Sequence, residues 1–404
     1  YEGYKKTKVG IVPEKWENKK LGELYAERND VNCSDEQLLS ITVDRGVIPR
    51  VQIQGKDNSS EDKSKYKHIS KGDIGYNTMR MWQGVSALSQ YDGIVSPAYT
   101  VLKPSAQVNA LCFSYLFKLT NMINVFYRHS QGLVDDTRSL KYEWFKNIAV
   151  SVPSLPEQEK IAAILQTEDK VIELQQKKID ELKRLKKGYL SKMFPKKGCN
   201  VPEIRFPGFT DAWEQRKLGD IADIVGGGTP STGNQSYWDG DIDWYAPAEI
   251  ADQIYANSSQ KKITGLGYEN SSAKMLPPGT VLFTSRAGIG KTAILTRKGC
   301  TNQGFQSIVP HRGELDSYFI FSRTGELKRY GELVGAGSTF VEVSGKQMAV
   351  MELMMPPTMR EQQTIGGFFQ QLDHLITLHQ RKCDEEKQKK KALMQLLLTG
   401  IVRT

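Results

Sequence analysis

The sequence predicts an α+β fold in which two tandem-repeat globular domains, mixed in structure but rich in strands, are separated by two long coiled-coil helices. Three observations lead to this fold class. The 404-residue chain repeats itself, the first part of each repeat has short apolar runs between turn residues, and the second part is almost free of glycine and proline. At roughly 100–200 residues per domain, this length suits two domains that each bury their own core.

The repeat is visible in two motifs that recur in the same order. A Trp-Glu-x-x-Lys-Leu-Gly motif opens at Trp16 and again at Trp213, 197 residues later. A Glu-Gln-x-x-Ile motif at 157–161 returns at 361–365, 204 residues later. Because the order is kept and the two offsets are nearly equal, the pattern indicates a tandem duplication of a unit of about 200 residues.

The first part of each unit, residues 1–155 and 201–358, is predicted to be a globular domain. Its apolar runs are short, as at 279–284, and turn residues such as Pro277 and Pro278 bound them. Such runs are typical of short strands in a mixed domain with some helix.

The second part of each unit, residues 156–200 and 359–404, is predicted to be a long helix. Apolar residues recur there with a period of about 3.5, which is typical of a coiled-coil seam. Two matching seams favour helices that pack on each other, whereas two independent amphipathic helices, each covering its own domain, are the alternative. The expected seam and partner-docking residues are Ile161, Leu165, Ile172, Ile179 and Leu182 in the first helix and Ile365, Phe369, Leu372, Ile376 and Leu393 in the second.

The net charge of +9 is concentrated on the predicted helices. Residues 157–198 carry +4 and residues 360–404 carry +3. Lysine runs at matching positions of both helices suit a surface that follows a nucleic-acid backbone, and a solvated helix face is the simpler alternative.

Cysteine usage and hydropathy indicate the compartment. The five cysteines include no C-x-x-C pair, so we expect neither a disulfide framework nor a zinc ribbon, and a reducing cytoplasm is the expected location. No run approaches the ~18 apolar residues of a membrane span, and no secretory leader is recognisable.

No motif predicts a catalytic residue or a metal ligand. The triplet 290–292 (Gly-Lys-Thr) resembles the end of a nucleotide-binding P-loop, but that motif needs a glycine where this chain has Ser285. His374 and His379 lack the helical spacing of a zinc site. An ATP-binding enzyme that uses 290–292 is therefore only an alternative class.

The remaining chemistry is that of binding, in polar loops punctuated by glycine. Arg and Lys side chains read guanine, and Asn and Gln read adenine. Arg80 and Arg286 occupy equivalent repeat positions, where capping of a shared turn is the structural alternative. The DNA-binding candidates are Arg45, Gln52, Gln54, Lys56, Asn77, Thr78 and Arg80 in the first domain and Thr284, Ser285, Arg286, Lys291, Asn302, Gln303 and Gln306 in the second.

Three features of the chain belong together: the Trp-Glu-x-x-Lys-Leu-Gly opening of each unit, Gly-Gly-Thr-Pro at 227–230 followed by the segments 237–244 and 285–291, and the Pro-x-x-x-Glu-Gln-x-x-Ile entry to each long helix. With these features the chain resembles the DNA-sequence specificity subunits of Type I restriction–modification systems. The resemblance covers essentially the whole chain. The first half departs from the pattern of the second, because it lacks the Gly-Gly-Thr-Pro loop and differs at 76–82 from the second half at 282–288.

The resemblance implies a DNA-binding subunit that is not itself an enzyme. Each domain is then a target recognition domain that reads one half of a bipartite double-stranded DNA site, and the antiparallel helices set the gap and dock two DNA methyltransferase (modification) subunits. Those subunits bring S-adenosylmethionine, and motor/endonuclease (restriction) subunits use ATP and Mg²⁺, so no cofactor is expected on this chain. A coiled-coil scaffold without a nucleic-acid role is the other alternative.

Overall fold

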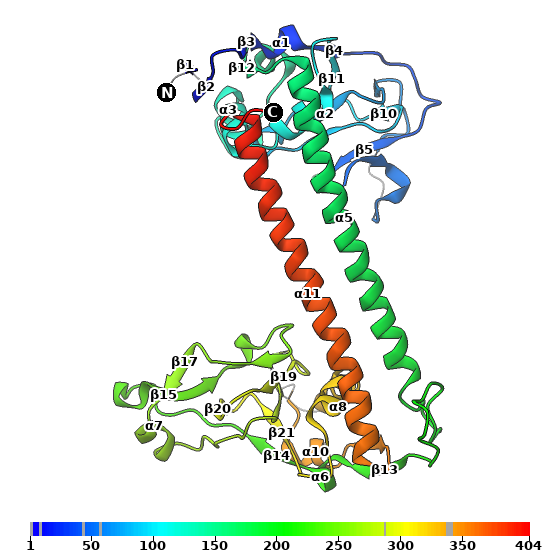
Figure 1. The fold of residues 1–404 in the computed structure, drawn as a ribbon, viewed down its shortest axis with the longest axis vertical. Coiled ribbons are helices and arrows are strands. Elements are labelled where there is room, and N and C mark those ends of the chain that lie inside the picture. The colour runs from blue at the N-terminus through cyan, green and yellow to red at the C-terminus, as the bar shows by residue number, and fades with distance from the viewer. Residues whose placement is uncertain (1–2, 8–9, 43–44, 56–58, 287, 337–341) are drawn as a thin grey trace. The chain divides into compact units, whose positions relative to one another are not determined.

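The computed structural model describes the whole chain except residues 1–2, 8–9, 43–44, 56–58, 287 and 337–341 (Figure 1). The chain forms two compact units, and we call Tyr1–Gln176 with Arg381–Thr404 unit 1 and Lys177–Gln380 unit 2. Both unit boundaries fall inside a long helix. Each unit therefore contains one globular domain and a part of both long helices, whereas the sequence pattern suggests four consecutive segments.

The globular domain of unit 1 combines short strands with short helices. Its helices are α1 (Leu21–Leu24), α2 (Ala110–Leu116), α3 (Thr120–His129), α4 (Tyr142–Phe145) and the 3-10 turns η1 (Arg50–Gln52), η2 (Met81–Gln83) and η3 (Asp135–Thr137). Its strands are β1 (Tyr4–Thr7), β2 (Gly10–Pro13), β3 (Glu17–Lys20), β4 (Tyr25–Arg28), β5 (Leu39–Thr42), β6 (Gly46–Pro49), β7 (Lys67–Ile69), β8 (Ile74–Asn77), β9 (Ser86–Leu88), β10 (Gly93–Val95), β11 (Tyr99–Pro104) and β12 (Ala149–Val152).

The strands of unit 1 form a four-stranded sheet with the order β4-β11-β8-β9 and several two-stranded ladders. The ladders pair β1 with β2, β3 with β12, β5 with β6 and β7 with β10. Buried aromatic rings of α2, α3 and α4 pack beside this sheet, and Phe117 contacts Phe113, Phe126 and Phe145 edge-on.

The globular domain of unit 2 repeats this plan with additions. Its helices are α6 (Leu218–Ile221), α7 (Gly265–Glu269), α8 (Ser317–Ser322), α9 (Thr324–Gly335), α10 (Gly345–Ala349) and the 3-10 turns η4 (Gln235–Tyr237) and η5 (Pro247–Glu249). Its strands are β13 (Glu214–Lys217), β14 (Ala222–Gly226), β15 (Trp238–Tyr245), β16 (Tyr255–Ala256), β17 (Lys261–Ile263), β18 (Val281–Phe283), β19 (Thr292–Leu295), β20 (Gly299–Thr301), β21 (Gln306–Pro310) and β22 (Glu352–Met355).

The main sheet of unit 2 has the order β14-β21-β18-β19-β16, so its first four strands follow the same path as β4-β11-β8-β9 in unit 1. The β13–β22 ladder likewise repeats the β3–β12 ladder. Unit 2 adds a three-stranded sheet, β17-β15-β20, in which β15 and β20 run parallel. The duplication is thus visible in the topology, and the two domains differ in what they add to it.

Two long helices complete the fold, and they confirm the predicted α+β class with paired helices. They are α5 (Leu155–Lys192), of 38 residues, and α11 (Met359–Leu398), of 40 residues. All ten expected seam residues are buried or half-buried. The first helix ends at Lys192, as expected from Pro195, which cannot continue the helix, so residues 193–200 of the predicted spacer segment are not helical.

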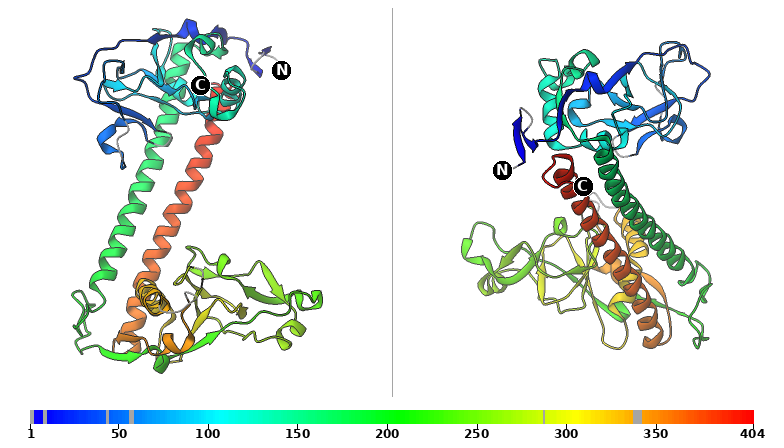
Figure 2. Two further views of the ribbon diagram at one scale, coloured as in Figure 1. Left: turned by 180° about the vertical axis from the view of Figure 1, so that it is seen from behind. Right: turned by 45° about the horizontal axis from the view of Figure 1, so that its top comes forward.

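The two helices pair antiparallel within each unit. In unit 1 the first turns of α5 (Ile161, Leu165) share a core with the last turns of α11 (Leu397, Leu398), and the views agree that these ends lie side by side (Figures 1 and 2). In unit 2 the end of α5 shares a core with the start of α11 through Leu182, Met193, Ile365, Phe369 and Leu372. In the described part of the chain, no helix combines the length and the apolar composition that membrane spanning requires.

Candidate nucleic-acid interface

The Glu-Gln pair at the start of α5 anchors this helix to the domain of unit 1. The Glu157 carboxylate, 6% exposed, accepts a hydrogen bond from Trp16 Nε1 at 3.2 Å. It also accepts two from the Arg403 guanidinium, at 2.5 and 2.9 Å. One buried carboxylate therefore joins the opening tryptophan motif, the first turn of α5 and the tail that follows α11.

An equivalent anchor exists in unit 2, where another tryptophan and another arginine are the donors. Glu361, 1% exposed, accepts from Trp213 Nε1 at 3.2 Å and from Arg205 at 2.7 and 2.8 Å. These hydrogen bonds raise the pKa of Arg205 above its ordinary value, and the two-point guanidinium–carboxylate geometry is among the stronger pairings in proteins. In both units the anchoring arginine follows the end of the other long helix.

The glutamines of the same motif bind backbone. Gln158 Oε1 accepts from Asn109 N at 2.8 Å, and Gln362 Oε1 accepts from Asp316 N at 3.0 Å. Both glutamines are buried. The motif residues thus have structural roles, and they recur because both domains attach to a helix in the same way.

The glycine of the opening motif is required by close packing. A Cβ on Gly22 would lie 2.7 Å from Lys146 Cβ, and one on Gly219 would lie 2.9 Å from Ala349 Cβ. Backbone oxygens of the same two neighbours would lie 3.0 and 3.1 Å away. A side chain at either position therefore displaces backbone of the neighbouring segment.

We expect Gly219→Ala to destabilise unit 2 by about 1–3 kcal/mol, the usual cost of overpacking. Gly188, in the exposed part of α5, is the matched control because nothing lies within 4 Å of its added Cβ. Gly188→Ala is expected to stabilise the protein by roughly 0.5–1 kcal/mol, since alanine loses less backbone entropy in a helix. Urea denaturation of both variants measures this, and equal effects of the same sign would contradict it.

A hydrogen-bonded triad joins the paired helices to the domain in unit 2. Asp373 on α11 accepts from Lys186 Nζ on α5 at 2.6 Å and from the Tyr318 hydroxyl at 2.9 Å. Burial, followed by the Asp373 charge, raises the pKa of Tyr318 above its ordinary value, which keeps the hydroxyl a donor.

Unit 1 contains the same triad with the helices exchanged. Asp169 on α5 accepts from Lys390 Nζ on α11 at 2.5 Å and from the Tyr115 hydroxyl at 2.6 Å. Asp169 and Lys390 each lie 204 residues from their counterparts in unit 2. Each unit therefore pairs the aspartate of its own repeat's helix with the lysine of the other repeat's helix.

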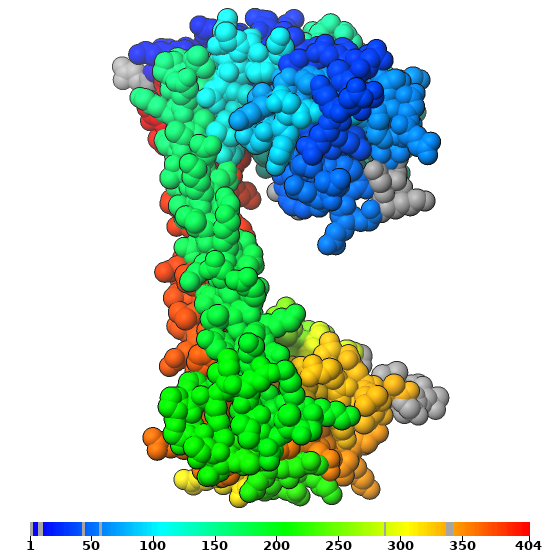
Figure 3. Space-filling view, turned by 90° about the vertical axis from the view of Figure 1, so that its right-hand side faces the viewer, coloured from blue at the N-terminus to red at the C-terminus, as the bar shows by residue number. Residues whose placement is uncertain are grey.

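Apolar side chains remain exposed on the outer faces of both long helices. Figure 3 shows one side of α5 uncovered by other segments of the chain. The exposed apolar residues are Leu155, Ile164 and Leu174 in unit 1 and Leu185, Leu375 and Leu378 in unit 2. A helix face of this composition suits packing against partner helices.

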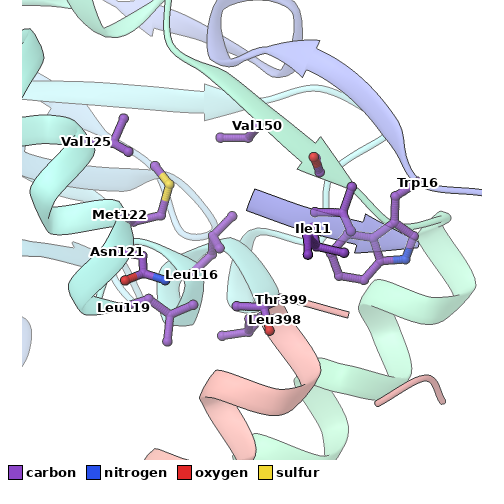
Figure 4. A pocket seen from close by; sticks show the side chains of 12 residues that line it. Ile11, Trp16, Leu116, Leu119, Asn121, Met122, Val125, Val150, Leu398 and Thr399 are labelled. Carbon is purple, nitrogen blue, oxygen red and sulfur yellow. The ribbon is translucent and has the colours of Figure 1, made fainter. Parts of the chain in front are cut away.

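A small apolar cleft lies beside the Trp16 anchor in unit 1 (Figure 4). Its volume is about 90 Å³. It lies between the N-terminal segment, α2, α3 and the end of α11. Its apolar lining includes Ile11, Leu116, Leu119, Met122, Val125 and Leu398.

The first-domain candidates fall into two places. Arg45, Gln52 and Gln54 are exposed around the β5–β6 hairpin and η1, where Arg45 donates to Gln52 O at 3.4 Å. Lys56 lies outside the described residues. The hairpin thus presents a group of polar side chains that are available for contacts.

The second place is the turn after β8. Asn77 Oδ1 accepts from Met79 N at 2.9 Å, and the Thr78 hydroxyl donates to Ala98 O at 2.9 Å. Both side chains therefore hold the turn, whereas Arg80 is exposed on it. Of this group the structure makes Arg80 the accessible member.

Two second-domain candidates are buried, which corrects the expectation that they face DNA. Thr284 and Ser285 are both 0% exposed. The Thr284 hydroxyl donates to Gly288 O at 2.8 Å and accepts from Lys291 N at 3.0 Å. The Thr284 hydroxyl belongs to the framework of the loop and Ser285 is buried beside it, whereas the candidates Arg286 and Lys291 are exposed.

The triplet 290–292 does not form a P-loop. A Cβ on Gly290 would lie 2.4 Å from Lys328 Cγ, and Thr292 begins strand β19 rather than a helix. A P-loop binds phosphate at the N-terminus of the helix that follows it. Arg286, on the same loop, pairs with Glu342 at 2.8 Å.

The Gly-Gly-Thr-Pro loop brings Thr229 to Gln303, where the hydroxyl donates to Gln303 Oε1 at 2.5 Å. Its glycines allow this approach, because a Cβ on Gly227 would lie 2.0 Å from Asn302 O. Gln303 is exposed, whereas Asn302 and Gln306 are half-buried. The half-buried Thr229 and the exposed Gln303 thus form a hydrogen-bonded polar pair at this loop.

The sequence pattern missed the exposed polar segment 231–236. Trp238 Nε1 of β15 holds its first residue by donating to Ser231 O at 3.1 Å, and Trp244 Nε1 holds the preceding loop by donating to Gly228 O at 2.8 Å. The sequence signal that could have located this segment is the aromatic strand β15, since the segment lies between this strand and the Gly-Gly-Thr-Pro loop.

Comparison with known proteins agrees on one family. The family model described as "Type I restriction modification DNA specificity domain" matches residues 13–184 and 210–387. The putative type I restriction enzyme MjaX specificity subunit of Methanocaldococcus jannaschii is 26% identical, over 100% of this chain and 97% of its own length.

One further relative and one solved structure are also similar to this chain. The MjaIX specificity subunit of the same organism is 36% identical over 41% of this chain and 38% of its own length. The crystal structure of the Type-I restriction-modification system S subunit from M. genitalium has the same fold, with a TM-score of 0.60 at 11% identity, over 95% of this chain and 96% of that one.

Proposed function

Because this chain belongs to the Type I restriction–modification DNA specificity family, we propose that its two domains each read one half of a bipartite DNA target. One observation carries the proposal. The two units repeat the same order of sheet strands and the same buried carboxylate anchor, yet they differ in the loops attached to the sheets. A repeated sheet with different loops suits two different half-sites, since sequence is read by side chains that reach base edges.

The accessible candidates for readout are those that the loops expose. In the first domain they are Arg45, Gln52, Gln54 and Arg80, and in the second Arg286, Lys291, Gln303 and the segment 231–236. The chain itself supplies recognition rather than catalysis, and the start of strand β19 at Thr292, where a P-loop has a helix, supports this reading.

The long helices are proposed to set the gap between half-sites and to dock two methyltransferase subunits. Exposed apolar residues on both helices and the exchanged Asp–Lys–Tyr triads support this part of the proposal. Because the two triads are equivalent, two identical subunits can bind alike around an asymmetric target. The methyltransferase subunits bring S-adenosylmethionine, and the motor/endonuclease subunits bring ATP and Mg²⁺.

Methylation mapping tests this function directly. Removing this chain from its cell is expected to abolish methylation at one bipartite motif. Gln303→Ala is expected to weaken recognition of one half-site only, with the loss of about 1–3 kcal/mol that is typical of a good base contact. Gln215→Ala, an exposed glutamine on β13, is the matched control and should leave the motif unchanged. An unchanged methylome without the chain would refute the function.

A further inference from the structure

Three potential metal ligands from two separate parts of the sequence meet in unit 1. The Cys33 thiol, the Glu36 carboxylate and the His68 imidazole each have a ligand atom within 4.8 Å of the other two. Among the described residues, this is the only group of three or more His, Cys, Asp or Glu side chains whose ligand atoms lie this close together. None of the three has a part in the proposed recognition of DNA, so the group requires an explanation of its own.

Local backbone structure brings two of these side chains together. Cys33 and Glu36 stand at the two ends of a turn that is closed by a hydrogen bond from Glu36 N to Cys33 O at 3.1 Å. Asn32, just before it, has a φ of 64°, in the left-handed region that asparagine tolerates. The first and fourth residues of such a turn can bind one ion together.

The third ligand comes from a neighbouring strand. His68 lies on β7, which pairs with β10 opposite Ile94, and its backbone N donates to Asp30 O at 2.8 Å. This bond and another from Asn32 N to Ser64 O at 3.0 Å hold the loop that contains Cys33 against β7. The ligand atoms are therefore brought together by the backbone itself.

The orientation of the His68 ring suits metal binding. Nδ1 faces Glu36 Oε2 at 2.6 Å, and Nε2 faces the Ser70 hydroxyl at 2.9 Å. A metal-binding histidine almost always donates its second ring N–H to a nearby acceptor, which fixes the tautomer that leaves the other nitrogen as the ligand. Ser70 is such an acceptor for Nε2–H, and it leaves Nδ1 for the metal.

We propose that Cys33, Glu36 and His68 bind one Zn²⁺ ion, with water as the fourth ligand. Thiolate, imidazole and carboxylate are the three ligand types that zinc combines in tetrahedral sites. Metal–ligand bonds of about 2.0–2.3 Å place ligand atoms roughly 3.3–3.8 Å apart. Binding therefore requires the His68–Glu36 contact to lengthen by about 1 Å and the thiol to approach. His68 and Glu36 have side-chain exposures of 18% and 38%, so water reaches the site.

Such an ion clamps the loop between β4 and β5 onto β7. The loop leads directly into the β5–β6 hairpin, and Arg50 N donates to Leu38 O at 2.9 Å at the base of this hairpin. Zinc therefore stabilises the part of unit 1 that carries Arg45. The described part of unit 2 contains no equivalent group, so the clamp is an addition to one repeat only.

The test uses the full chain and measures metal content, affinity and spectrum. We expect one zinc per chain, a melting temperature that rises with zinc, and, with Co²⁺ in place of zinc, the absorption of a cobalt–thiolate bond. Cys33→Ser is expected to abolish the thiolate absorption and to weaken zinc binding at least about tenfold, and Ser70→Ala to weaken it by about 10–100-fold. Cys199→Ser, an exposed cysteine of unit 2, is the matched control.

The outcomes separate a metal site from a simple ion pair between His68 and Glu36. An ion pair alone predicts no stoichiometric zinc and no cobalt–thiolate absorption in the wild-type chain, and either absence would overturn the proposal. Equal losses in Cys33→Ser and Cys199→Ser would also overturn it, because they would mean adventitious binding to surface thiols. Since Cys33 lies in a partly exposed loop, the serine variant is expected to fold, and its circular dichroism spectrum checks this.

Discussion

Replacing Glu361 by alanine is expected to lower the free energy of unfolding of unit 2 by about 3–5 kcal/mol, the usual cost of breaking a buried ion pair. The carboxylate is 1% exposed, and its removal leaves the Arg205 guanidinium, 11% exposed, without its charge partner. It also leaves the Trp213 indole N–H without an acceptor. Urea denaturation measures the total loss, and hydrogen exchange at the first turns of α11 locates it.

The equivalent variant of unit 1 provides the matched comparison. Glu157→Ala removes the same hydrogen bonds, but its partner Arg403 is 40% exposed and can recover water. We therefore expect a smaller loss than for Glu361→Ala. The loss of stability for Glu361→Gln is expected to be smaller than for Glu361→Ala, because the amide keeps an acceptor for Trp213 and only the charge is lost. A cost below 1 kcal/mol for Glu361→Ala, or a larger cost for Glu157→Ala, would contradict this account of the anchor.

Inserting one heptad into both long helices is expected to lengthen the unread gap of the target by up to about 3 base pairs and to leave both half-sites unchanged. Seven residues add about 10 Å of helix, and DNA rises about 3.4 Å per base pair. The insertions belong after Gln176 in α5 and after Gln380 in α11, where one unit ends and the other begins. A heptad returns each seam to the same face, so both units keep their own packing.

The single-helix insertion is the control, and the two Asp–Lys pairs explain why. Lys186 pairs with Asp373 in unit 2 and Asp169 pairs with Lys390 in unit 1. Lengthening α5 alone shifts one of these pairings relative to the other, so we expect lost or weakened methylation rather than a longer gap. Methylation mapping reads both variants, and an unchanged gap after the paired insertion would refute the role of the helices as a ruler.

The expected site residues show which properties a sequence pattern can predict and which it cannot. The sequence predicts Arg45, Arg80 and Gln303 as DNA contacts because they are polar residues in loops, and the structure exposes all three. The same criterion predicts Thr284 and Ser285, which are buried because their loop folds back on itself through the Thr284 hydroxyl. Composition shows that a loop is polar, but only the path of the backbone decides which of its side chains face outward.

The proposed zinc ligands show a second limit of sequence patterns, which do not detect residues that only the fold brings together. Cys33 and His68 are 35 residues apart and form no recognisable metal-binding spacing. The pairing of β7 with β10 and the turn at Cys33 bring them together. A spacing rule detects ligands that share one turn or helix, whereas this group depends on contacts between distant segments.

The duplication, the α+β class and the two long helices follow from the amino-acid sequence alone, because repetition and a period of about 3.5 are properties of the linear chain. That each unit contains parts of both helices depends on tertiary packing. An amphipathic helix buries its seam against whichever surface matches it, and here the matching surface belongs to the other repeat. The anchors at Glu157 and Glu361 and the exchanged triads at Asp169 and Asp373 follow from that choice.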